Sequence, residues 1–333
     1  MSPEEESGSA LRCTLFDADG TDQAVELSKG VVKSVRENQL LWIELQQRDE
    51  KGISVLREGV DLHDEQATLL ASEKATVQLL RYPERVHLRL LAVHDPEEPD
   101  KRRQTVATPT PIDVIVAPNV VITAHEGEVP AFERFHDEVR GDSAFGALDA
   151  AGFLTMLVDA VLDSYLEMVE AIERRVDTLD EAALRPGESE PFLREVVLLR
   201  RRVALLRRAL APHRWTFAPL ARPDFELEGL GRPWPGIVDR LERTVDSVEN
   251  ARELLIGTFD VYMASSAQRT NEVMKTLTIL SAVLLPAVVF AGVMGMNFRI
   301  GFFDNPQNFF VAVGGMAVMA IVVLGVARWR GWI

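Results

Sequence analysis

The chain has only one cysteine, Cys13, among its 333 residues. A lone cysteine excludes a disulfide framework and a thiolate zinc site within one copy of the chain. Basic residues are in the minority, since 36 Lys and Arg stand against 51 Asp and Glu and give a net charge of −15. Nucleic-acid binding needs a basic face that neutralises phosphates, so we expect no nucleic-acid partner.

Enzyme motifs are also missing. No Gly-rich phosphate loop, Ser/His/Asp set or paired-carboxylate motif stands out, so we expect no enzyme, no ATPase and no cofactor. The six histidines lack metal-site spacing such as His-x₃-His and are each expected to be structural: His63, His87, His94, His125, His136 and His213. The acidic N-terminus has no apolar core, which excludes a signal peptide and predicts a domain that stays in the cytoplasm.

Two long apolar runs without charge lie near the C-terminus. The first lies between Lys275 and Arg299, and the second between Asp304 and Arg328. Each has the ~20 residues that a helix needs to cross a ~30 Å hydrocarbon core. The short connection between them predicts a hairpin. The sequence therefore predicts an integral membrane protein with most of its mass outside the bilayer.

Basic residues flank the outer ends of this hairpin. Arg269 and Lys275 precede the first run, and Arg328 and Arg330 follow the second. By the positive-inside rule both termini face the cytoplasm and the connecting loop faces out. We therefore expect a multi-pass protein of the cytoplasmic (inner) membrane.

Residues 1–146 are predicted to form a cytoplasmic α/β domain. Short β-rich or alternating runs are typical of strands, and they fall at 11–16, 40–45, 86–93, 112–116 and 120–123. Residues 54–72 are predicted to form one helix, and the charged segment 95–103 a loop.

Residues 147–275 are predicted to form a cytoplasmic helical stalk. One helix covers 148–184, a second runs from Pro191 to about Ala211, and a Pro/Gly-rich connector covers 212–235. A helical pattern then runs from Pro235 to Asn297 without a break, a length of roughly 95 Å at 1.5 Å per residue. A monomer cannot bury so long a helix, so we expect a bundle with other copies of the chain.

Residues 276–327 are predicted to form the transmembrane hairpin: a pore helix at 276–297, an extracytoplasmic loop at 298–308 and an outer helix at 309–327, followed by a basic tail at 328–333. A row of residues at alternating intervals of three and four positions, called the seam here, runs along the pore helix and the turn before it. The seam consists of Asn271, Met274, Thr278, Ser281, Leu285, Val288, Gly292 and Gly295. Such a seam is one face of a helix in a parallel bundle, although small residues are also favoured at any packed membrane contact. Asn271 and Asn297 at its two ends suit a water-filled axis that holds a hydrated cation by oxygen dipoles.

The first span and the residues just before it contain a series of short motifs: Thr270-Asn271-Glu272-Val273-Met274-Lys275, Leu277-Thr278-Ile279, Leu285-Pro286, Ala291-Gly292 and Gly295-Met296-Asn297-Phe298. This series resembles the CorA family of magnesium transporters. The resemblance weakens upstream and is faintest in the first 145 residues. It implies an α+β cytoplasmic domain followed by long stalk helices and a two-helix C-terminal transmembrane hairpin, assembled as a funnel-shaped homopentamer.

The resemblance also implies roles for single residues. Gly295, Met296 and Asn297 form the metal-selecting loop, in which Asn297 offers its side-chain oxygen to the waters of Mg²⁺ and Gly295 a carbonyl. Mg²⁺ sheds water reluctantly, so a ring of neutral acceptors suits the hydrated ion. The narrow hydrophobic stretch of the family matches Met274 and Leu277, with Asn271 as a polar ring below it. The acidic funnel position matches Asp260, for which an ordinary solvated charge is the alternative.

The chain departs from the family at several positions. The acidic outer loop Met-Pro-Glu-Leu is absent, and only Asp304 is left to attract cations, opposed by Arg299. Val288 replaces a hydroxyl residue. The regulatory aspartate of the family falls on Gly236, with Asp239 a turn later as the candidate. These losses leave room for a transporter of Zn²⁺, Co²⁺ or Ni²⁺ with the same fold, with or without a coupled proton. The alternative of another class is a non-conducting membrane-anchored sensor or scaffold.

Overall fold

The computed structural model describes residues 11–17, 19, 21–93, 109–127, 129–139, 150–185, 189–222, 225, 234–296, 305 and 307–331. The chain divides into two compact units. The first comprises Met1–Ala182 and Gly187–Gly257, and the second comprises Ala183–Pro186 and Thr258–Ile333. The predicted loop at 95–103, His94 and Asn297 lie outside the described residues.

The first unit holds a seven-stranded sheet in the order β2-β1-β3-β7-β6-β5-β4. The strands are β1 (Leu11–Asp17), β2 (Gln23–Ala24), β3 (Gln39–Leu45), β4 (Gln78–Arg81), β5 (Val86–Ala92), β6 (Thr110–Ala117) and β7 (Val120–Ala124). Only the β3 and β7 neighbours run parallel. All five predicted strands are confirmed. The short, largely exposed β2 and β4 were not predicted, because neither has an apolar pattern.

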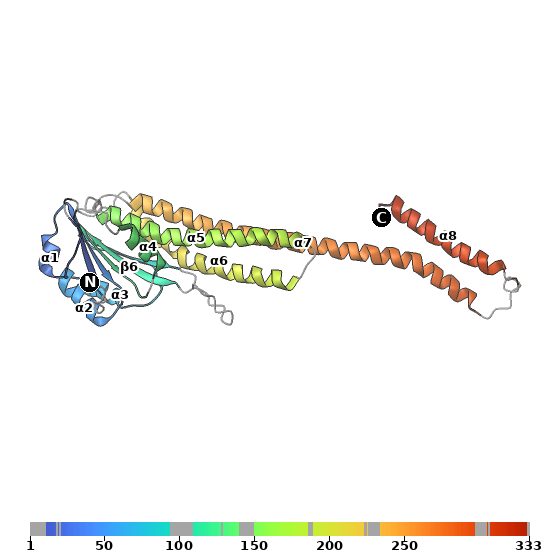
Figure 1. The fold of residues 1–333 in the computed structure, drawn as a ribbon, viewed down its shortest axis with the longest axis horizontal. Coiled ribbons are helices and arrows are strands. Elements are labelled where there is room, and N and C mark those ends of the chain that lie inside the picture. Colours follow the sequence, from blue (N-terminus) through green and yellow to red (C-terminus); the bar gives the residue numbers. More distant parts are fainter. Residues whose placement is uncertain are drawn as a thin grey trace, which may run out of the picture. The chain divides into compact units, whose positions relative to one another are not determined.

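Helices cover both faces of this sheet (Figure 1). On one face, α1 (Lys29–Ser34), α2 (Glu50–Val60) and α3 (Asp64–Leu70) pack over a core that includes Ile43 and Leu56. On the other face, Trp42 of β3 packs edge-on against Phe135 of α4 (Pro130–Val139) and Phe153 of α5 (Ala150–Leu184), with ring centroids 5.6 and 5.3 Å apart. Burial on two sides explains why the central strands β3, β6 and β7 are rich in apolar residues.

The predicted single helix at 54–72 is wrong. The structure has two helices there, and Asp61 between them adopts φ 55°, a left-handed cap that ends α2. Gln66 then closes a capping box with His63 and starts α3. The break turns the chain so that Leu62 and Leu70 both reach the core.

A buried ion cluster lies within the sheet. Asp113 of β6 stands opposite Arg89 of β5 and accepts hydrogen bonds from Arg89 Nε at 2.9 Å and Arg89 Nη2 at 2.6 Å. Arg48 Nη1 lies 2.5 Å and His87 Nε2 lies 2.7 Å from the same carboxylate. Burial raises the pKa of Asp113, but these hydrogen bonds outweigh it and lower the pKa to about 2.

The two predicted stalk helices are confirmed as α5 (Ala150–Leu184) and α6 (Ser189–Phe217), which lie side by side with the first part of α7 (Trp234–Met294) (Figure 1). The predicted connector at 212–235 is wrong at its start, because α6 continues through Pro212 and is followed by the short η2 (Ala218–Ala221). Its last turn is anchored by buried His213, whose Nε2 accepts a hydrogen bond from the Leu91 N–H at 3.0 Å. Tyr165 of α5 donates to the Leu91 carbonyl at 2.6 Å. Leu91 lies past the last β4–β5 pair, so the helices satisfy its backbone groups in place of a strand.

The second unit holds the end of α7 (Trp234–Met294) and α8 (Gln307–Trp329). The predicted long helix is confirmed as one element of 61 residues that includes Pro286. Both helices contain a stretch long and apolar enough to cross a membrane, with mean hydropathies of 2.4 and 2.6. Almost none of either stretch is buried within one chain.

Candidate pore-lining face of α7

One face of α7 is left uncovered in a single chain. Every residue of the predicted seam is exposed, as is Leu277: the set is Asn271, Met274, Leu277, Thr278, Ser281, Leu285, Val288, Gly292 and Gly295. Exposure reaches 67% for the Leu285 side chain and 66% for Val288. Large apolar side chains this exposed must contact lipid or another protein surface.

The opposite face of α7 carries the partly buried residues. They recur at helical spacing and are Ile279, Val283, Pro286, Ala287, Phe290 and Met294. A matching stripe on α8 consists of Asn308, Ala312, Met316, Ala320, Val323 and Ala327. Figure 1 shows α8 folded back alongside the end of α7, so these stripes indicate the faces that the two helices turn toward each other. Ser281 and Leu285 are each two residues from Val283, about 200° around the helix, which places the seam on the far side from α8.

Two threonine hydroxyls on or beside the seam are satisfied by the helix itself. Thr278 Oγ1 donates to the Met274 carbonyl at 2.7 Å, and Thr276 Oγ1 donates to the Glu272 carbonyl at 3.0 Å. Such bonds to the preceding turn let a hydroxyl remain in an apolar helix without an unpaired donor. The oxygen of Thr278 still has a lone pair to accept a hydrogen bond from water.

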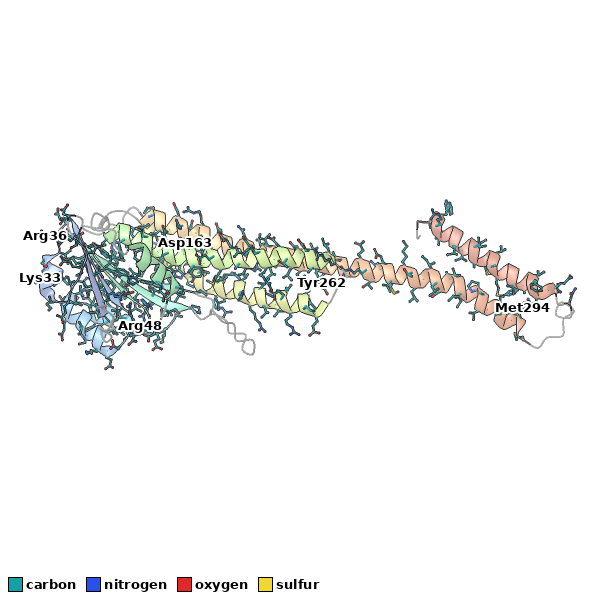
Figure 2. All side chains as sticks on the ribbon, viewed as in Figure 1. Lys33, Arg36, Arg48, Asp163, Tyr262 and Met294 are labelled. Atoms are coloured by element: carbon teal, nitrogen blue, oxygen red, sulfur yellow. The ribbon has the colours of Figure 1, made fainter. Side chains whose placement is uncertain are left out.

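The predicted selectivity loop begins where α7 ends. Met294 is the last helical residue (Figure 2), and the Gly295 N–H donates to the Ala291 carbonyl at 2.9 Å. The Met296 N–H donates to the Val293 carbonyl at 3.2 Å, so both residues continue as a turn. Asn297 lies outside the described residues. The metal-binding role of all three residues stays a prediction.

The seam spacing continues toward the N-terminal side of Asn271. Ala267, Ala264 and Asp260 follow at steps of four, three and four residues, and all three are exposed. In the first unit, Asp239 is also exposed on α7. Small residues thus separate the carboxylate of Asp260 from the polar and apolar positions of the span. The roles predicted for Asp260 and Asp239 stay predictions.

The first unit also contains a buried polar cluster that the sequence did not indicate. Glu44 of β3 is 2% exposed, and its Oε1 lies 3.3 Å from His125 Nε2 and 2.9 Å from His136 Nε2. Burial raises the pKa of Glu44, but the hydrogen bonds from the two histidines lower it to about 2. The histidines follow Glu44 by 81 and 92 residues, so no local spacing reveals the cluster. Parallel pairing of β3 with β7 brings it together, since the His125 N–H donates to the Leu45 carbonyl at 3.1 Å.

Comparison with known proteins shows which family and which relatives this chain resembles. The family model of the CorA-like Mg²⁺ transporter protein matches residues 37–329. The cobalt/magnesium transport protein CorA of Thermotoga maritima is 28% identical over 231 residues, which are 67% of this chain and 64% of that protein. The divalent cation transporter CmaX of Pseudomonas aeruginosa is 29% identical over 185 residues, 54% of each chain. These alignments span less than two thirds of either relative.

Solved structures share the fold over nearly the whole chain. The complete CorA magnesium transporter of Methanocaldococcus jannaschii has a TM-score of 0.74 at 16% identity and covers 97% of this chain and 98% of its own. The full-length CmaX structure has a TM-score of 0.72 at 22% identity, and the match covers 98% of this chain and 100% of the CmaX chain. The predicted arrangement of an α/β domain, long helices and two C-terminal apolar helices is therefore confirmed.

Proposed function

The chain belongs to the family of CorA-like Mg²⁺ transporter proteins, and we propose that it conducts divalent cations across the cytoplasmic membrane along the exposed face of α7. The proposed assembly is a homopentamer in which five copies of α7 surround the ion path and five copies of α8 face the lipid. Both termini and the α/β domain lie in the cytoplasm. The transported ion is Mg²⁺, moving inward.

The observation that carries this proposal is the exposed face with Asn271, Thr278 and Ser281 on the side of α7 away from α8. Hydrocarbon offers no hydrogen-bond partner to the Asn271 amide or to the remaining lone pairs of the Thr278 and Ser281 oxygens, whereas water does. Around a shared axis, five such faces line a path for water and ions. The membrane potential supplies the driving force, since moving two charges down 100 mV yields about 4.6 kcal/mol.

The proposed roles along the path follow its chemistry. The ring of Gly295, Met296 and Asn297 offers neutral oxygen acceptors to hydrated Mg²⁺ at the outer mouth. Met274 and Leu277 form an apolar constriction that gates by dewetting, with Asn271 below it. Asp260 draws cations toward the cytoplasmic end, and Asp239 is the candidate regulatory position.

Uptake of Mg²⁺ into proteoliposomes under an inside-negative potential tests the proposal. We expect uptake by the wild type and none by Asn297→Ala. The matched control is Asn308→Ala, which changes a partly buried asparagine of α8 away from the seam, and it should take up Mg²⁺ as the wild type does. Unchanged uptake by Asn297→Ala contradicts the selectivity role. Absence of uptake of any divalent ion contradicts transport and favours the membrane-anchored sensor or scaffold.

A second candidate function is transport of Zn²⁺, Co²⁺ or Ni²⁺ by the same fold. The sequence of the outer loop favours it, because Arg299 opposes the only acidic residue, Asp304, and weakens the attraction for a strongly hydrated ion. Zn²⁺ uptake that responds to a proton gradient, together with no Mg²⁺ uptake, selects this alternative.

A further inference from the structure

A cavity of about 460 Å³ lies in the first unit, at the end of the sheet where β6 turns into β7. Its volume falls within the range of about 300–1,000 Å³ that small-molecule sites occupy. Ile115, Val120 and Ile122 form its buried wall, and half-buried Val32 of α1 and Val60 of α2 line it as well. Because these side chains offer no hydrogen bonds, the wall suits an aliphatic group.

The half-buried Arg85 lines this cavity with part of its guanidinium group unused. Its Nη1 donates to the carbonyl oxygens of Val60 at 3.1 Å and Asp61 at 3.4 Å, which fixes the side chain against the end of α2. Among the described residues, Arg85 Nε and Nη2 have no hydrogen-bond partner. These two N–H groups form one edge of the planar fork, and such an edge binds a carboxylate through two parallel hydrogen bonds. The cavity therefore offers a place for a carboxylate beside an aliphatic group.

Glu84 supplies the opposite charge at the same cavity. It lines the cavity and is exposed, so the cavity opens to solvent beside it. Within the part of the chain that the structure describes, Glu84 forms no ion pair with Arg85 or with any other residue. An anionic ligand without a positive group would bring a like charge toward Glu84, which is unfavourable. A ligand with both an ammonium and a carboxylate group pairs with both residues.

The turn between β4 and β5 holds these two charged residues in place. The Tyr82 N–H donates to the Arg85 carbonyl at 2.9 Å and closes the turn, and Pro83 restricts the backbone inside it. The Tyr82 ring stacks on His63, the residue that begins α3, with ring centroids 4.6 Å apart. Because the turn is already fixed, a ligand does not have to order it on binding, and this favours affinity.

We infer that the cavity binds an α-amino acid with an apolar side chain, such as leucine. The carboxylate pairs with the free edge of Arg85, the ammonium group pairs with Glu84, and the side chain lies against the apolar wall. A fatty acid has no ammonium group for Glu84, and a sugar would place many hydroxyl groups against a wall that cannot hydrogen-bond them. The inference does not rest on the proposed transport, because residues of the α/β domain alone form the site.

Calorimetric titration of the full-length protein with L-leucine tests the inference. The protein is held in lipid nanodiscs, so that no detergent competes for the apolar wall. We expect saturable binding of one leucine per chain by the wild type. Glu84→Gln should weaken binding at least tenfold, and it removes an exposed charge without breaking a contact within the chain. Arg85→Gln should also weaken binding at least tenfold, although it removes the hydrogen bonds to the end of α2 as well.

Two analogues and a control variant separate the contributions of the two charges. Isocaproate lacks the ammonium group of leucine and isoamylamine lacks the carboxylate, and each should bind at least tenfold more weakly than leucine. Arg57→Gln, which removes an exposed arginine of α2 that pairs with Asp64, should bind leucine as the wild type does. The inference is overturned by the absence of saturable binding in the wild type, by equal leucine affinity in the wild type and Glu84→Gln, or by isocaproate binding as tightly as leucine.

Discussion

Buried His213 should make the protein lose stability as the pH falls from about 6.5 to 4. The ring is 1% exposed, its Nε2 accepts from Leu91, and its Nδ1 lies 3.1 Å from the Leu210 carbonyl, so both nitrogens are occupied in the neutral form. Burial disfavours the charged ring and lowers its pKa from 6.5 to about 4.

The sign of the effect follows from the lowered pKa. Above about pH 6.5 the ring is neutral in both the folded and the unfolded chain, so it does not make the free energy of unfolding depend on pH. Between the two pKa values the unfolded chain binds a proton that the folded chain does not, so the free energy of unfolding decreases as the pH decreases. At about 1.4 kcal/mol per unit, the whole shift corresponds to about 3 kcal/mol.

Chemical denaturation in detergent at about pH 7.5 and about pH 4.5, followed by the fluorescence of buried Trp42 and Trp234, measures this effect. Replacing the ring by a neutral amide, His213→Gln, should remove about 2–3 kcal/mol of the stability lost between the two pH values. His63→Gln, at an exposed histidine, should change nothing. Equal pH dependence in the wild type and His213→Gln would refute the assignment of His213 as a neutral buried ring.

Two further substitutions test the ion cluster and the gate. Asp113→Asn leaves Arg48 and Arg89 buried without a carboxylate and should lower the free energy of unfolding by about 3–5 kcal/mol. The control Asp64→Asn breaks an exposed ion pair with Arg57 and should lower it by less than about 1 kcal/mol. Equal losses for the two variants in chemical denaturation would contradict a stabilising role of the buried ion cluster. Met274→Asn places a wettable group in the proposed constriction and should raise passive divalent flux into proteoliposomes, whereas Leu280→Asn, at a similarly exposed position off the seam, should not. A larger flux in Leu280→Asn would mean that the ion path runs along another face.

Elements with strong local signals could be predicted from the sequence. The apolar strands, α5, the long α7 and the two apolar spans each carry a periodicity that does not depend on distant residues. The heptad spacing also predicts the exposed face of α7. That this face extends through Ala267 and Ala264 to Asp260 becomes clear only when exposure is followed along the whole helix.

The errors arose where distant contacts decide the local structure. The apolar positions continue through Asp61, so the left-handed break between α2 and α3 has no signature in the spacing. Pro212 is a helix-stop signal, yet α6 continues because His213 is bonded to the sheet. The Glu44 cluster depends on which strand lies beside β3, and pairing across about eighty residues cannot be read from the sequence of either strand.

Reaction of single cysteines with a water-soluble thiol reagent tests most directly whether the seam of α7 faces water. The native Cys13 is buried, and burial raises its pKa to about 11, so it stays an unreactive thiol background. Ser281→Cys in proteoliposomes should react and lose ion uptake, whereas Val283→Cys on the face toward α8 should keep it. Faster reaction of Val283→Cys, or no reaction at Ser281→Cys, would contradict a water-filled path along this face.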